Sequence, residues 1–268
     1  MRILKASDPM ITVGMPVYNA GECLFLAVNS IINQSYDNWE LLIIDDGSTD
    51  NAVHKLTLDG VLSDPRIRVI SDGKNKGLAA RLNEAIDLSN GKYFARMDQD
   101  DISLPTRFEE QLNFLVRNPT IDLLATRVRT IDNTGCIKGE LPYSLTHETI
   151  CAKPWRSFYM PHPTWMGHTS WFRKFRYPSP APFFSEDQEL LLRSYKSSKF
   201  ASLDEVFLYY RIKDYVNIRK LLLTHLAIYK LQCQHFLKEN FFYLIPSTVI
   251  FLVRLIKVLF NFLKQKFK

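Results

Sequence analysis

The 268-residue chain lacks the sequence signatures of several common enzyme classes. No GxGxxG follows its first apolar run, which disfavours a nicotinamide- or flavin-binding Rossmann enzyme, and no GxxxxGK[ST] occurs, which excludes a P-loop nucleotide triphosphatase. A GxSxG elbow is also absent, so no serine nucleophile stands in the setting that a hydrolase of this kind requires.

Cysteine is scarce, and the four residues present lie far apart without a CxxC pair: Cys23, Cys136, Cys151 and Cys233. We therefore expect neither a disulfide framework nor a structural zinc site, and a reducing, cytosolic setting fits best. Residues 1–10 contain charges and a proline but no apolar run, so we expect no secretory signal peptide.

Acidic residues are almost missing from one end of the chain. Residues 211–268 hold eleven Lys and Arg against two acids, a formal +9, whereas residues 1–210 hold 23 against 26, a formal −3. The overall charge of +6 is therefore a property of the C-terminal part. With 46% hydrophobic and 23% charged residues, the rest has an ordinary globular composition.

The first half alternates short, apolar, β-rich runs with longer amphipathic ones. This rhythm predicts β-α-β units around a mostly parallel sheet, an α/β fold. Predicted strands cover residues 10–17, 39–44, 67–70 and 93–97, and predicted helices cover 22–33, 50–58 and 78–88.

The second half is less regular. We predict a helix over residues 106–116, a strand over 121–131 and a helix over 184–195. Residues 142–182 are rich in aromatic side chains and proline and show little periodicity, so their aromatics are either core or a loop-built platform for a ring-shaped ligand.

Clustered carboxylates follow two of the apolar strands. Asp45 and Asp46 end the second strand, and Asp98, Asp100 and Asp101 end the fourth. Ligands of open α/β sheets bind beyond the carboxyl ends of the strands. Helix capping is the alternative explanation for the first cluster. For the second it is weaker, because three adjacent carboxylates repel one another unless a cation screens them. Oxygen ligands of this type suit Mg²⁺ or Mn²⁺ together with a phosphate-bearing substrate.

A further pair of acids, Glu186 and Asp187, opens the helix predicted over residues 184–195. Favourable placement near the positive end of the helix dipole would explain them without a function. A reaction at a metal-held phosphate also needs a base, however, and together these features suggest transfer from a diphosphate-activated donor.

Five blocks of this sequence resemble those of the family 2 glycosyltransferases of GT-A fold. They occur in the family's order over about residues 11–212: VGMPVYN (13–19), DDGSTD (45–50), GLAARLN (77–83), ARMDQDDISLP (95–105) and SED (185–187). A sixth block, HPTWM (162–166), resembles a His-Pro segment of many bacterial members, where it packs near the acceptor. Gln99 departs from the pattern, since small residues are common at its position.

The resemblance implies an inverting transferase that uses a nucleotide-diphosphate sugar. It implies that Asp98 binds the nucleotide and also contacts the metal, that Asp100 is the main metal ligand, and that Asp187 is the general base, with Glu186 as the competing candidate. The metal, Mg²⁺ or Mn²⁺, stabilises the departing diphosphate. The nucleotide pocket is implied to be lined by Pro16, Val17, Tyr18, Asn19, Asp45 and Asp46.

The C-terminal part is interpreted from its pattern alone. Residues 240–253 carry no charge but are too short to span a bilayer. Further on, one helical face carries Arg254, Lys257, Asn261, Lys264 and Lys268, opposite a face of Leu, Ile, Val and Phe. This pattern favours a basic amphipathic helix in a membrane interface. A tilted transmembrane helix and a helix packed on the protein's own body are the alternatives.

These observations predict a GT-A-like glycosyltransferase domain over residues 1–215 and a helical, membrane-associating tail over residues 216–268. The expected acceptor is a hydroxyl of a lipid-linked or cell-surface glycan, and the expected location is the cytoplasmic face of the plasma membrane, peripheral or monotopic. We expect phospholipid, and no nucleic acid, to bind the basic tail. The alternative functions are a sugar nucleotidyltransferase and a non-catalytic scaffold that binds a sugar nucleotide.

Overall fold

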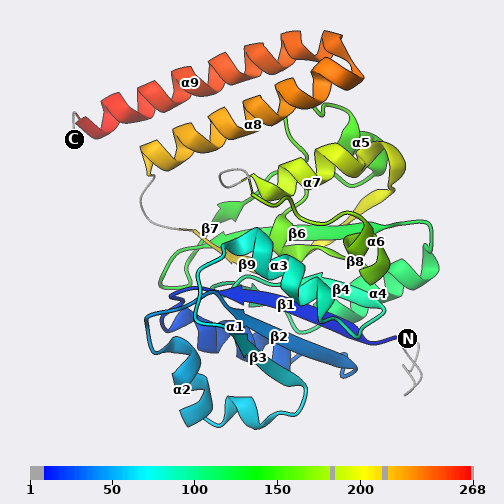
Figure 1. Ribbon diagram of the computed structural model, residues 1–268, viewed down its shortest axis with the longest axis vertical. Coiled ribbons are helices and arrows are strands. Elements are labelled where there is room, and N and C mark those ends of the chain that lie inside the picture. Colours follow the sequence, from blue (N-terminus) through cyan, green and yellow to red (C-terminus); the bar gives the residue numbers. More distant parts are fainter. Residues whose placement is uncertain (1–8, 182–184, 213–216, 267–268) are drawn as a thin grey trace.

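The computed structural model describes residues 9–181, 185–212 and 217–266. A single twisted sheet crosses the molecule with helices on both of its faces, and a pair of long helices lies over one end (Figure 1). The sheet order is β3-β2-β1-β4-β8-β6-β9-β5, with β7 paired to β6.

The first four long strands confirm the predicted parallel core. They pair in the order β3-β2-β1-β4, and every pairing among them is parallel. The strands are β1 (Ile11–Val17), β2 (Trp39–Asp45), β3 (Ile67–Ser71) and β4 (Tyr93–Arg96). The segments between them are α1 (Cys23–Ile32), α2 (Ala52–Leu58), η1 (Val61–Ser63) and α3 (Leu78–Asp87).

Beyond β4 the sheet is mixed. β8 pairs antiparallel with both β4 and β6, whereas β6 and β9 run parallel. The elements here are β5 (Ile102–Ser103), α4 (Arg107–Arg117), β6 (Leu123–Ile131), β7 (Ile137–Glu140), α5 (His147–Cys151), η2 (His162–Thr164), β8 (Met166–His168), α6 (Thr169–Lys174), α7 (Glu186–Ser194), η3 (Tyr195–Ser197) and β9 (Phe200–Arg211). The sequence pattern did not predict the long strand β9.

Apolar side chains form a core on each face of the sheet. One cluster joins α1 and α4 to the sheet, and the other joins α3, α6 and α7 to it. Trp165, Trp171 and Phe172 are buried in the second cluster. The aromatic segment is therefore core at these three positions and not an exposed platform.

The tail is a helical hairpin and not one helix. It consists of α8 (Ile218–Glu239), a 3₁₀ turn η4 (Phe241–Tyr243) and α9 (Leu244–Lys266). The two helices pack along each other, with the Tyr229 ring stacked on Phe251 at 4.3 Å. α8 lies between α9 and the body, above α7 (Figure 1). The predicted domain boundary at residue 215 falls among residues 213–216, outside the described part of the chain.

The apolar character of α9 is stronger than the charge-free run suggested. Within the described residues, Phe241–Phe260 is long and apolar enough to cross a membrane, by length and composition alone, and 11% of its most apolar window is buried. Arg254 does not point outward with Lys257, since its Nη2 donates to the Arg156 carbonyl at 2.6 Å.

Candidate active site

The parallel strands reverse their order between β1 and β4. β2 and β3 lie on the other side of β1, so the strand order changes direction between β1 and β4. In an open α/β sheet, the carboxyl edge at such a point is the usual place of the ligand crevice. Tyr18 follows β1 here and is 46% exposed. Pro16 and Val17 are buried in β1, and the Val17 carbonyl accepts from the Asp46 N–H at 2.7 Å.

The Gln99 side chain connects the loop after β4 to the loop after β1. Its Oε1 accepts from the Tyr18 backbone N–H at 2.7 Å, and its Nε2 donates to the Tyr18 carbonyl at 3.1 Å. The side-chain amide therefore satisfies both backbone groups of Tyr18, as a neighbouring strand would. The departure from the small residues that the resemblance implies at this position thus has a structural role.

Asn19 connects the loop after β1 to the loop after β2. Its Oδ1 accepts from the Thr49 N–H at 2.8 Å, and its own N–H donates to Ser48 Oγ at 3.1 Å. Asn19 adopts a positive φ of 49°, which asparagine tolerates better than most residues. The predicted pocket residue is therefore part of the frame of the crevice.

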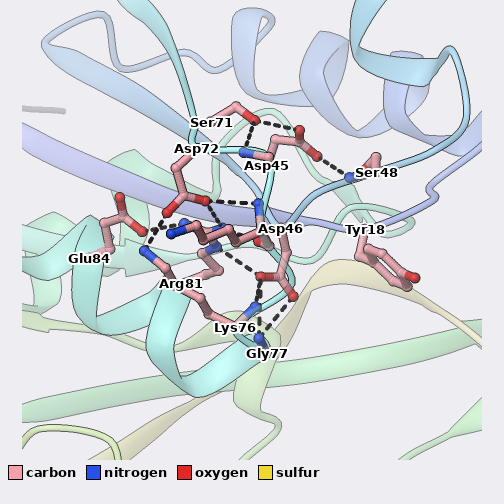
Figure 2. A network of polar contacts seen from close by, with 12 residues as sticks. Tyr18, Asp45, Asp46, Ser48, Ser71, Asp72, Lys76, Gly77, Arg81 and Glu84 are labelled. Atoms are coloured by element: carbon pink, nitrogen blue, oxygen red, sulfur yellow. Dashed lines mark hydrogen bonds and ion pairs between the residues drawn. The ribbon is translucent and has the colours of Figure 1, made fainter.

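Asp45 ends β2 and Asp46 follows it, and the two carboxylates have different environments (Figure 2). Asp46 is 5% exposed and accepts from the backbone N–H groups of Lys76 and Gly77 and from Arg81 Nε at 2.8 Å. Asp45 is partly exposed and accepts from the Ser48 N–H and the Ser71 hydroxyl. Burial raises the pKa of Asp45, but these hydrogen bonds outweigh it and the pKa is lowered.

Arg81 organises the wall of the crevice that follows β2 and β3. Its guanidinium is fully buried and pairs with Asp46, Asp72 and Glu84 (Figure 2). Hydrogen bonds from Arg81 and Lys76 lower the pKa of Asp72. In Figure 2 the Tyr18 ring lies beside this network and points away from it.

Arg96 and Arg211 contact the acidic segment that follows β4. Arg96 Nη1 lies 2.7 Å from Asp98 Oδ1. Arg211, at the end of β9, donates from its backbone N–H to Asp101 Oδ1 and from Nε to the Asp100 carbonyl. Asp101 is buried, and its pKa is raised by burial and by the charge of Asp98. Asp98 and Asp100 are partly exposed.

These carboxylates fit a divalent cation that shares its ligands with a substrate. Among the described residues, no three His, Cys, Asp or Glu side chains converge on one point, so the chain does not form a cage. Mg²⁺ is commonly held by one or two carboxylates together with substrate phosphates. Asp98 and Asp100 supply a donor set of that kind.

Glu186 and Asp187 lie at the N-terminus of α7, within electrostatic reach of the same arginine. Burial and the charge of Asp187 raise the pKa of Glu186 to about 7, while Arg96 lowers it. Burial also raises the pKa of Asp187, and a hydrogen bond from Gln188 and the charge of Arg96 oppose this. Asp187 is partly exposed, whereas Glu186 is 8% exposed.

A pocket of about 380 Å³ joins this helix end to the wall after β3. It is lined by Glu186, by the start of α3 and the residues just before it (76–80), and by residues 178–181. Nearby, His162 of the His-Pro block shares a 2.7 Å hydrogen bond with the Tyr177 hydroxyl. Burial lowers the pKa of His162 and raises that of Tyr177, so both groups are neutral near pH 7.

The sequence reasoning did not identify Arg96, Arg211 or Arg81 as parts of the site. Arg96 carried a signal, because it is a charged residue inside an otherwise apolar strand, which requires a buried partner. Arg211 carried none, because its partners are about 110 residues away.

Comparisons with known proteins show the family and the fold of this chain. The family described as "Glycosyl transferase family 2" matches residues 12–176, more than half of the chain. The chain is 29% identical to the O-antigen biosynthesis glycosyltransferase WbnJ of Escherichia coli, over 86% of this chain and 90% of that one. It is 31% identical to the E. coli enzyme named UDP-Glc:alpha-D-GlcNAc-diphosphoundecaprenol beta-1,3-glucosyltransferase WfgD, over 53% of this chain and 55% of that one. Several relatives are covered over only about half of their length, or less.

Solved structures share the fold at low sequence identity. The mannosyltransferase PcManGT from Pyrobaculum calidifontis, in complex with GDP-Man and Mn²⁺, has a TM-score of 0.64 at 13% identity and covers 91% of this chain and 74% of that one. TarS of S. aureus (residues 1–349), in complex with UDP-GlcNAc, has a TM-score of 0.63 at 17% identity, over 83% of this chain and 66% of that one. The curled sheet with flanking helices is thus a GT-A fold.

Proposed function

The chain belongs to glycosyl transferase family 2 and is a glycosyltransferase, and from this premise we propose that it moves a sugar, with inversion, from a nucleotide-diphosphate sugar to a hydroxyl of a lipid-linked or cell-surface glycan. One observation carries the proposal. The crevice between β1 and β4 brings Tyr18 and Asp98 to the same edge of the sheet, and Arg96 lies within electrostatic reach of both Asp98 and Glu186.

In this proposal the donor lies in the crevice. The exposed Tyr18 ring offers an apolar face for the base, and the loops tied by Gln99 and Asn19 form the walls. Asp98 and Asp100 would hold Mg²⁺ or Mn²⁺ against the diphosphate, and the bound cation would neutralise the charge that develops on the leaving group. Asp46 contributes by fixing the loop over residues 73–77, because its oxygens are taken up by backbone N–H groups and Arg81.

Asp187 is proposed as the general base. It accepts the proton of the acceptor hydroxyl while that oxygen forms a bond to the anomeric carbon and the bond from this carbon to the diphosphate breaks on the opposite face. A base must reach its substrate: Asp187 is partly exposed, whereas Glu186, 8% exposed, lines the pocket of about 380 Å³ and remains the competing candidate. A carboxylate with a raised pKa also accepts a proton more readily near neutral pH.

The acceptor side is proposed to face a membrane. η4 and α9 expose an apolar stripe at alternating three- and four-residue steps on their outward side: Phe242, Ile245, Val249, Leu252, Ile256 and Leu259. α8 packs along α9 and carries five charged residues, so a spanning α9 would have to leave α8 or draw charges into the bilayer. We therefore propose that the hairpin lies in the cytoplasmic interface, where Lys257 adds attraction to anionic lipid.

A vesicle flotation assay tests the membrane proposal. The full chain should float with vesicles of phosphatidylethanolamine and phosphatidylglycerol, and the pair Leu252→Glu and Ile256→Glu should abolish flotation. Val69→Glu, a change of the same kind at an exposed residue of β3, should leave it intact. Unchanged flotation of the double variant would contradict the proposal. The proposal would also be contradicted if the wild type did not float but formed a dimer that the double variant disrupts.

A further inference from the structure

Residues 154–158 connect the hairpin to the first turn of α7. On the hairpin side, Gln232 Nε2 of α8 donates to the Pro154 carbonyl at 3.3 Å. The Trp155 ring lies 4.7 Å from the Tyr243 ring, and the Arg156 carbonyl accepts from Arg254 Nη2 of α9. Each of these three residues therefore contacts a different part of the hairpin.

On its other side, the Phe158 ring lies 5.7 Å from the Tyr195 ring, and among the described residues the side chain of Gln188 makes the hydrogen bonds between α7 and this segment. Gln188 Oε1 accepts from the Phe158 N–H at 3.0 Å and from Ser157 Oγ at 3.1 Å. Gln188 Nε2 donates to the Phe158 carbonyl at 3.3 Å and to Asp187 Oδ2 at 3.2 Å. The amide thus pairs with both backbone groups of Phe158 and directs its remaining N–H at the carboxylate.

Little space separates these parts. The cavity lined by Pro154, Phe158, Gln188 and residues of α7 and α8 measures about 10 Å³, roughly the room for one water molecule. Closely packed interiors transmit displacements instead of absorbing them. From this packing we expect a shift of α8 to displace residues 154–158, and with them the amide that contacts Asp187.

We propose that Gln188 is a positioning residue for Asp187, and that residues 154–158 make the orientation of this carboxylate depend on the seating of the α8–α9 hairpin. The inference rests on the proposed role of Asp187 as base. In this proposal the α8–α9 hairpin has two roles. It contacts the membrane, and it also keeps the Asp187 carboxylate in position on the acceptor side.

The first test separates the chemical step from donor binding. Gln188→Met keeps the length of the side chain and removes its hydrogen bonds. The rate of nucleoside diphosphate release is measured on the full chain with Mn²⁺ and UDP-, GDP- and dTDP-sugars. We expect kcat to fall about tenfold or more and the donor KM to stay within about twofold, because misplacement of a reacting group costs rate and not donor binding. Gln234→Met, at an exposed position of α8, is the matched control and should be unchanged.

The second test needs no substrate. Amide hydrogen exchange of the full chain reports on the Phe158 N–H, which Gln188 protects. The hairpin variant Gln232→Met with Arg254→Met should speed exchange at Phe158 severalfold, as Gln188→Met does, and should also lower kcat. If exchange at Phe158 is unchanged in the hairpin variant, the coupling is refuted whether or not a donor has been found.

The outcomes distinguish the two proposals. Loss of activity in Asp187→Asn with a normal kcat in Gln188→Met would leave the function standing and overturn the inference. Full activity in Asp187→Asn would refute the base itself. A parallel change of kcat and donor KM in Gln188→Met would indicate general damage to the site and would also overturn the inference.

Discussion

Replacing Glu186 with glutamine should make the protein more stable above neutral pH. The Glu186 carboxyl is 8% exposed, and burial together with the charge of Asp187 raises its pKa from an ordinary 4.5 to about 7. Folding therefore favours the protonated form. The stability that comes from this preference is fully present below pH 4.5 and is lost as the pH rises through about 7.

The size of the effect follows from the two pKa values. Each pKa unit corresponds to about 1.4 kcal/mol, so the difference between 4.5 and about 7 amounts to about 3 kcal/mol at full ionisation. Glutamine cannot ionise and avoids this loss. Asp187 and Asp98 raise the pKa of Glu186 and Arg96 lowers it, so Asp187→Asn should recover part of the same gain.

The assay is urea unfolding of the wild type and Glu186→Gln from pH 4.5 to 8.5, with EDTA present and without nucleotide. The free energy of unfolding should differ little at pH 4.5, and the variant should gain up to about 3 kcal/mol by pH 8.5. A difference that is independent of pH, or one that shrinks as the pH rises, would refute the electrostatic account of this carboxyl pair.

Three further predictions concern the donor side. Gln99→Ala should weaken the binding of UDP or GDP in the presence of Mn²⁺ about fivefold by calorimetry, because the loops after β1 and β4 are then ordered only on binding, and unchanged affinity would contradict this. Arg81→Met should lower the free energy of unfolding by about 3–5 kcal/mol in urea, since Asp46 loses a buried partner, and a loss under about 1 kcal/mol would count against the network. Mn²⁺ should bind measurably only together with the nucleotide, and Asp100→Asn should remove that binding, whereas tight binding of Mn²⁺ alone would contradict a shared site.

The parallel half of the fold was predictable because three of its strands, β1, β2 and β4, are buried on both faces and end at turn or polar residues. The strand β9 was not predictable from the sequence, because it contains two acidic residues. Asp204 and Glu205 interrupt the apolar pattern, but in the structure Thr126 pairs with Leu203 and Arg127 with Val206, so the two acids lie in a bulge outside the ladder. A bulge of this kind depends on the partner strand and leaves no period in the sequence.

In the site, too, the residues next to a strand end were predictable from the sequence, whereas their partners far away in the chain were not. The carboxylates that follow the strands stand out because the chain itself brings them to the sheet edge. The partners that hold them do not, since Asp46 and Arg81 are 35 residues apart and Arg254 contacts Arg156 across 98 residues. In α9 both the buried and the outward faces are apolar, so the sequence pattern could not tell which face covers α8.

The central claim is tested most directly by product formation from a sugar nucleotide. The full chain is incubated with Mn²⁺ and a panel of UDP-, GDP- and dTDP-sugars, with lipid-linked glycans in anionic vesicles as acceptors. We predict that one donor yields a new, inverted glycosidic bond in the wild type, and that Asp187→Asn gives no product although it binds the nucleotide normally. Wild-type activity in Asp187→Asn, or a retained anomeric configuration in the product, would contradict the account.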